Sequence, residues 1–179
     1  MRRLSPTVDR SRFRPSCGGE EVRRRLGIAA DAPVVVCVAR LVRRKGQDTL
    51  VRIWPQVLEL FPDAVLLLVG DGPDRQRLER MVGRRGIGTS VLLVGSVPWE
   101  EVPAHMDAGD VFAMPVRTRR LGLEVEAFGI VYLEAAACGL PVVGGGSGGA
   151  AEALAQARVL LQNRTEPPSQ AEGLDLNGG

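Results

Sequence analysis

Short apolar runs alternate with longer amphipathic segments along most of the chain. Five runs have the continuous apolar character of parallel strands covered on both faces, at residues 34–39, 64–69, 91–94, 111–114 and 141–143. Segments with helical periodicity lie between or after them, at about residues 47–60, 74–84, 99–108 and 130–138. This alternation predicts an α/β fold, a doubly wound parallel sheet that binds ligands at the carboxyl ends of its strands.

The two ends of the chain lack this pattern. Residues 1–20 have the character of a linker, and residues 162–179 are polar, with a proline pair and terminal glycines. A composition of the second kind is typical of disorder. We therefore expect an N-terminal linker over residues 1–20, one Rossmann-like domain over residues 21–161 and a disordered tail over residues 162–179. The chain stops where a further strand and closing helices would help complete the sheet, so we expect the sheet to be incomplete at its C-terminal end.

Composition argues against a nucleic-acid partner and against a membrane-spanning segment. The chain has 179 residues, 45% of them hydrophobic, and a formal net charge of +2, which suits one domain with a real core. Basic residues are concentrated near the N-terminus, and we interpret them as solvated side chains rather than as a site for nucleic acid or acidic lipid. No run approaches the roughly 20 apolar residues of a membrane span. Any membrane contact would be peripheral, on the inner face.

The three cysteines indicate a reduced, cytoplasmic chain. Cys17, Cys37 and Cys138 are odd in number and have no metal-binding spacing. Cys37 and Cys138 lie in apolar surroundings, as small buried hydrophobic residues do. The only histidine, His105, falls in a predicted helix, and we interpret it as a surface residue rather than a catalytic one. We expect no metal and no cofactor.

A basic turn directly after the first strand is the first candidate site. It runs from Arg40 to Lys45 and precedes the helix at residues 47–60. Lys45 is the only lysine among 23 basic residues, and it offers a compact, mobile charge where arginine offers a rigid fork. Two cations beside the free amides of a helix N-terminus suit a diphosphate. A solvated basic turn is an equally good interpretation of this segment alone.

The segment from residue 115 to residue 139 carries a stronger candidate. Its helix is apolar on nearly all sides and contains one charged residue, Glu134. A buried carboxylate needs a partner, and Glu134 can reach back toward the helix N-terminus. A diphosphate would be held there by the amides near Ile130 and Val131, with Glu134 accepting from ribose hydroxyls. Gly129 permits close backbone approach, and Glu126 would meet the transferred sugar.

The alternative for Glu134 is an ion pair with a core arginine such as Arg117.

Two further segments are weaker candidates for ligand contact. The glycine-rich turn at residues 144–149 permits backbone approach to a phosphate, and Val97, after the third strand, could form a wall against a base. Four acidic residues near helix ends and turns are better explained by capping: Asp71, Asp74, Asp107 and Asp110.

Taken together, these motifs resemble the carboxyl-terminal, donor-binding domain of glycosyltransferase family 4, which has the two-domain GT-B fold. The resemblance extends over residues 5–153. RLVRRKGQD, MPVRTR and VEAFGIVYLEA are the segments most similar to the GDP-mannose-dependent phosphatidylinositol monomannoside mannosyltransferases of actinobacteria. Four positions depart from the usual residues of the family: Thr7, Glu124, Ala127 and Ala151.

The resemblance implies a retaining transferase with GDP-mannose as donor and no metal. It implies that Arg40 and Lys45 neutralise the leaving diphosphate and that Glu126 lies near the donor sugar, as catalytic residues. It places Glu134 on the ribose and Val97 against the base. The glycolipid acceptor would be bound by an amino-terminal domain that this chain lacks, so we expect the chain alone to be inactive. A non-catalytic nucleotide-sugar-binding module, or an inactive fragment, is the alternative.

Overall fold

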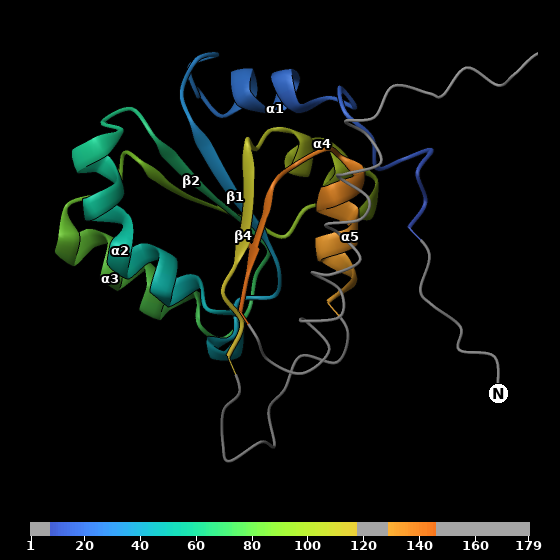
Figure 1. Cartoon of the computed structure of the whole chain (residues 1–179). Coiled ribbons are helices and arrows are strands. Elements are labelled where there is room, and N and C mark those ends of the chain that lie inside the picture. The colour runs from blue at the N-terminus through green and yellow to red at the C-terminus, as the bar shows by residue number, and fades with distance from the viewer. Residues whose placement is uncertain (1–7, 118–128, 146–179) are drawn as a thin grey trace, which may run out of the picture.

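The computed structural model describes residues 8–117 and 129–145, and these form one parallel sheet with helices on both faces (Figure 1). The sheet has the order β3-β2-β1-β4-β5, and every pair of neighbouring strands is parallel. The strands are β1 (Val34–Val38), β2 (Val65–Val69), β3 (Val91–Gly95), β4 (Val111–Met114) and β5 (Val142–Gly144). All five apolar runs are therefore strands, with ends within one residue of those predicted. The α/β prediction is confirmed.

The helices cover the sheet in two layers. The elements are α1 (Gly19–Arg25), η1 (Arg43–Lys45), α2 (Gln47–Leu60), α3 (Arg75–Arg85), η2 (Trp99–Glu101), α4 (Val102–Asp107) and α5 (Ile130–Ala137). Figure 1 shows α2 and α3 on one face of the sheet and α4 and α5 on the other. This is the doubly wound arrangement that the alternation of strands and helices predicts. Within the described residues, no helix combines the length and the apolar composition needed to cross a membrane.

The core explains why the strand sequences are apolar without alternation. Leu66, Leu67 and Leu68 of β2 are all fully buried, although successive side chains point to opposite faces. The layer on one face supplies Trp54 of α2, and the layer on the other supplies Tyr132 of α5. Each face of the sheet is thus covered by apolar side chains, as expected for an internal parallel strand.

Part of the segment predicted to be a linker packs into the domain. The structure describes this segment from Val8 onward, and the side chain of Phe13 is only 2% exposed, within the main core cluster. The ring of Phe13 lies 5.8 Å from that of Trp99. Helix α1 begins at Gly19, inside the range given to the linker. The sequence did not indicate this, because a single aromatic residue among arginines has no periodicity. The predicted tail, residues 162–179, lies outside the described residues.

The strand order creates one position where the direction of winding reverses. From β1 the chain proceeds through β2 to β3 on one side, and β4 and β5 are then added on the other side of β1. The connections that leave the carboxyl ends of β1 and β4 therefore go to opposite faces of the sheet. A crevice at such a switch point is where open α/β sheets bind ligands.

Candidate functional site

The turn after β1 is held by backbone and side-chain hydrogen bonds. Leu41 N–H donates to the carbonyl of Asp71 (2.9 Å), which ties this turn to the end of β2. Gln47, almost fully buried, donates from Nε2 to the carbonyl of Arg40 (3.1 Å). Gly46 joins η1 to α2 in the left-handed conformation, with φ of 81°. The side chain of Arg40 is exposed and that of Lys45 is half-buried. Both predicted cations thus lie at the carboxyl edge of the sheet.

The half-buried position of Lys45 brings its charge close to the sheet. Burial raises the pKa of the Cys37 thiol in β1 to about 12, and the charge of Lys45 acts in the opposite direction, lowering it. The ammonium of Lys45 therefore lies near the carboxyl-terminal half of β1. Cys37 and Cys138 are both buried and neither forms a disulfide, as predicted for small apolar residues.

Helix α5 approaches the same edge with its N-terminus. Gly129, the residue before the helix, has φ of 71° and provides no side-chain cap, so the first amides of α5 depend on another acceptor. The side chain of Ile130 is 41% exposed at this helix end, and that of Val131 is half-buried. The hydroxyl of Tyr132 donates to the carbonyl of Met114 (2.7 Å) and fixes α5 to the end of β4.

Glu134 is buried at the second turn of α5, with 7% of its surface exposed. Burial raises the pKa of its carboxyl from 4.5 to about 7. The alternative ion pair with Arg117 is not formed. The guanidinium of Arg117 instead donates from Nη2 to both carboxylate oxygens of Asp48 (2.8 Å each) and from Nη1 to Thr49 Oγ1 (3.0 Å). Glu134 is therefore a buried carboxyl whose ionised form is destabilised by its surroundings.

The segment after β4 contacts the turn after β1, at the same edge of the sheet as the N-terminus of α5. Arg117 N–H donates to the carbonyl of Arg44 in η1 (2.9 Å). Gly46 lies so close to Pro115 that a Cβ on the glycine would overlap the proline carbonyl. The turn that carries Lys45 and the strand to which α5 is fixed are thus in direct contact. The basic turn and α5 thus both contact the end of β4, beside the switch point between β1 and β4.

Among the other predicted site residues, Val97 is not brought together with this pair, and the rest are mostly outside the part of the chain that the structure describes. Val97 is half-buried after β3, at the far end of the sheet order, with β2 between it and β1. Glu126 and most of the glycine-rich turn, residues 146–149, lie outside the described residues. The roles given to Val97 and Glu126 stay predictions.

The capping interpretation of the acidic residues is correct for one and wrong for another. Asp107 accepts hydrogen bonds from the amides of Gly18 (3.1 Å) and Gly19 (2.8 Å) at the start of α1. Asp74 precedes α3 but makes no side-chain cap. It pairs with Arg77 through two bonds of 2.6 and 2.7 Å, because a nearby guanidinium competes with the helix amides for its oxygens.

The prediction of a surface histidine is wrong. His105 in α4 is only 1% exposed. Its Nδ1 lies 2.9 Å from the carbonyl of Glu101, and its Nε2 lies 3.2 Å from a nitrogen of Arg25. Helix α1, which the sequence pattern did not predict, packs against α4 and covers this side. The residue has a structural role, at the opposite edge of the sheet from Lys45.

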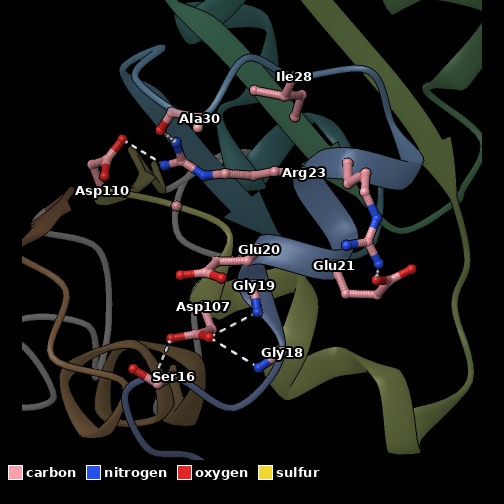
Figure 2. Close-up of a pocket in the computed structure, with 12 residues that line it drawn as sticks. Ser16, Gly18, Gly19, Glu20, Glu21, Arg23, Ile28, Ala30, Asp107 and Asp110 are labelled. Carbon is pink, nitrogen blue, oxygen red and sulfur yellow. Dashed lines mark hydrogen bonds and ion pairs between the residues drawn. The ribbon is translucent and has the colours of Figure 1, made fainter.

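The hollow in Figure 2 also lies at that opposite edge, between α1 and the end of α4. It has a volume of about 930 Å³. Its main polar groups are already used by the fold: Asp107 binds three backbone amides, and Arg23 binds the carbonyls of Ala30 and Ala32 and the carboxylate of Asp110. We interpret this hollow as structural.

Replacement of Asp107 by Ala tests that interpretation. The variant leaves the amides of Ser16, Gly18 and Gly19 without their acceptor, so we expect a loss of about 1–2 kcal/mol in the free energy of unfolding. Ligand binding at the carboxyl edge should not change. Chemical denaturation measures the loss, and Glu20→Ala, which alters an exposed neighbour, is the control. A stable variant with impaired ligand binding would contradict the structural role.

Comparison with known proteins gives one family and a consistent set of relatives. The family described as "Glycosyl transferases group 1" matches residues 19–176. A "GDP-mannose-dependent alpha-(1-6)-phosphatidylinositol monomannoside mannosyltransferase" of Mycolicibacterium smegmatis is 50% identical over 153 residues, which are 85% of this chain and 40% of the relative. A monoacylated-substrate enzyme of similar name from Corynebacterium glutamicum is 44% identical over 160 residues, 88% of this chain and 42% of the relative.

Solved structures agree with this fold. Anabaena HepE in complex with UDP and glucose superposes with a TM-score of 0.67 and 25% identity, covering 89% of this chain and 46% of HepE. Sucrose-phosphate synthase from Thermosynechococcus elongatus gives a TM-score of 0.65 and 34% identity, covering 79% of this chain and 34% of the synthase. This chain thus spans less than half the length of each of these proteins.

Proposed function

Since the chain belongs to the glycosyl transferases group 1 family, we propose that it is the donor-binding half of a retaining mannosyltransferase that uses GDP-mannose. The Rossmann-like sheet corresponds to one half of a GT-B fold. A phosphatidylinositol mannoside is the proposed acceptor, because the relatives from Mycolicibacterium and Corynebacterium carry that activity in their names. An amino-terminal half would bind it, since this chain spans about 40% of those relatives.

One observation supports this proposal above the others: the turn of Lys45 contacts the segment that follows β4, and α5 is fixed to the end of the same strand through Tyr132. A pyrophosphate placed there would accept hydrogen bonds from the first amides of α5, which have no side-chain cap, and from the ammonium of Lys45. Helix N-termini and flexible cations are suited to phosphate groups. Arg40, exposed at the same edge, would add a second positive charge.

The state of Glu134 also favours a ligand site. A carboxyl whose pKa is raised by burial to about 7 destabilises the fold at neutral pH, because its ionised form is poorly solvated. Such a cost is common where a residue serves binding rather than stability. Ribose hydroxyls of a bound nucleotide would donate to this carboxylate and compensate for the missing water.

The proposed reaction follows from these positions. The bond between the mannose anomeric carbon and the diphosphate oxygen breaks, and negative charge develops on the departing GDP. Lys45, Arg40 and the amides of α5 would stabilise that charge, which is the step at which fixed donors have their largest effect. Glu126 would lie beside the sugar. The acceptor hydroxyl attacks the same face that GDP leaves, gives up its proton to the departing phosphate, and so retains the configuration. The proposal requires no metal.

The competing function is a module that binds nucleotide sugars without catalysis. This alternative is considered because the chain spans about 40% of the length of the relative. Joining the chain to the amino-terminal half of the Mycolicibacterium smegmatis relative separates the two. Transfer of mannose by the joined protein supports the enzyme, and tight GDP-mannose binding without transfer supports the module.

Calorimetric titration of the chain with GDP, UDP and ADP tests the donor directly. We expect GDP to bind more tightly than the other two by about tenfold, equivalent to about 1.4 kcal/mol. Equal, millimolar binding of all three would contradict the assignment of GDP-mannose. Guanosine without phosphates serves as the control that separates base recognition from diphosphate recognition.

A further inference from the structure

We propose that Arg117 and Asp48 are positioning residues whose ion pair sets the geometry of the diphosphate site. The pair would hold the segment that follows β4 against the turn that follows β1. This inference rests on the proposed function, because it concerns how that same site is shaped. Neither residue need touch the ligand. Their effect would pass through Lys45 on one side and through α5 on the other.

The contacts of Arg117 join segments that are far apart in sequence. Its guanidinium reaches both oxygens of Asp48, 69 residues earlier, and the hydroxyl of Thr49, 68 residues earlier. Its backbone amide donates to the carbonyl of Arg44. Asp48 is 4% exposed, so one partner of this pair is shielded from solvent. Side-chain contacts and a backbone hydrogen bond of Arg117 therefore both connect the segment after β4 to the region that follows β1.

Neutralising Asp48 does not require Arg117. Arg77 of α3 lies 3.3 Å from the Asp48 carboxylate, and Arg52 of α2 lies 3.5 Å from it. Burial alone would raise the pKa of Asp48, but the hydrogen bond and charge of Arg117, followed by those of Arg77, bring it below its usual value. What Arg117 adds is a fixed position for the segment that follows β4. Its planar fork fixes the position of a strand end in a way that the other two arginines, both on helices, do not.

A small movement of this segment would be transmitted to both parts of the site. Gly46, next to Lys45, lies so close to Pro115 that the proline carbonyl leaves no room for a side chain on it. Met114, one residue before Pro115, accepts the hydrogen bond that fixes Tyr132 of α5. The chain of contacts from Asp48 to α5 is therefore continuous. Loosening it at Arg117 would let the lysine and the helix amides separate.

Two matched variants test the proposal. Arg117→Ala and Arg77→Ala each remove one arginine from Asp48, but only Arg117 reaches the segment after β4. We expect both to lower the melting temperature of the chain. GDP affinity, measured by calorimetry well below each melting temperature, should fall about tenfold in Arg117→Ala and less than about twofold in Arg77→Ala. Arg117→Lys keeps the charge without the fork and should remain weak.

The single lysine provides a second measurement that does not need GDP. Reductive methylation with a ¹³C label gives one lysine signal in the NMR spectrum, from Lys45, besides that of the N-terminal amine. We expect this signal to move toward the position of a solvated lysine in Arg117→Ala and to stay in place in Arg77→Ala. This readout stands even if the chain fails to bind GDP, an outcome that would overturn the proposed donor and not the positioning role of Arg117 and Asp48.

The two matched alanine variants offer two results that would overturn the positioning role. One is an unchanged Lys45 signal in Arg117→Ala, which would mean that the ion pair does not affect the turn. The other is an equal loss of GDP affinity in the Arg117 and Arg77 variants, which would mean that both act through general stability. Full recovery of affinity in Arg117→Lys would show that charge rather than the fork matters, and would likewise contradict the proposal.

Discussion

Replacement of Glu134 by Gln is expected to stabilise the fold above about pH 8, by up to about 3 kcal/mol. The carboxyl has a pKa of 4.5 when unperturbed and about 7 in the folded chain, because burial disfavours its ionised form. A folded-state pKa above the unfolded value means that the protonated form favours folding. Its contribution is complete below pH 4.5 and is lost as the pH rises through 7. Gln is neutral at every pH and keeps that contribution throughout.

Urea denaturation at a series of pH values measures this effect. The difference in the free energy of unfolding between Glu134→Gln and the unaltered chain should be small below about pH 5 and grow until about pH 8. Glu59→Gln, which neutralises an exposed carboxylate on α2, is the control and should show no such growth. A difference that does not change with pH would mean that Glu134 is ionised without cost in the folded state.

The same variant should bind GDP more weakly although it is more stable. Hydrogen bonds from ribose hydroxyls to a carboxylate are stronger than those to a neutral amide by about 1–2 kcal/mol, so we expect about a tenfold loss of affinity at pH 8. Calorimetry on the unaltered chain should also show weaker GDP binding below about pH 7, where Glu134 is protonated. A variant that gains stability and keeps its GDP affinity would remove Glu134 from the site.

Replacement of Lys45 by Ala is expected to reduce turnover far more than GDP affinity. The measurement uses the chain completed with the amino-terminal half of the Mycolicibacterium smegmatis relative. Negative charge on the diphosphate is greatest as the bond to mannose breaks, so a cation placed against it contributes more in the transition state than in the bound ground state. We expect kcat to fall by about a hundredfold to a thousandfold and GDP affinity by about tenfold.

Two controls separate this role from a general loss of structure. Guanosine, which has no phosphate, should bind the Lys45→Ala chain as well as the unaltered one. Arg84→Ala removes an exposed positive charge at the end of α3 and should leave turnover unchanged. Equal losses of kcat and of GDP affinity in Lys45→Ala would mean that the lysine only binds the ground state.

The local elements could be predicted from the sequence because their causes are local. The apolar runs in 34–39 and 64–69 are too continuous for a half-exposed strand, and they became the buried strands β1 and β2. Helix α2 has the predicted ends, Gln47 and Leu60, because a glycine precedes its periodic segment and a proline follows soon after it. The lone lysine and the lone carboxylate of the 130–138 helix were visible as exceptions to their surroundings.

The side-chain partners could not be predicted, because they depend on segments that are distant in the chain. Phe13 shows no periodicity, and it is part of a core most of whose other members, like its partner Trp99, lie far away in the chain. Arg117 is a plausible partner for Glu134 in sequence, yet it pairs with Asp48. The choice depends on which carboxylate the end of β4 faces, and periodicity carries no information about that.

The sequence by itself determined the α/β class, the places where strands end, and the residues suited to a diphosphate and a ribose. Only the tertiary structure decided that β4 lies next to β1, so that the turn of Lys45 and helix α5 both contact the end of β4. The physical reason is that strand formation follows from the burial pattern of a few adjacent residues. Strand order follows from how whole helices pack on the two faces, which no local segment specifies.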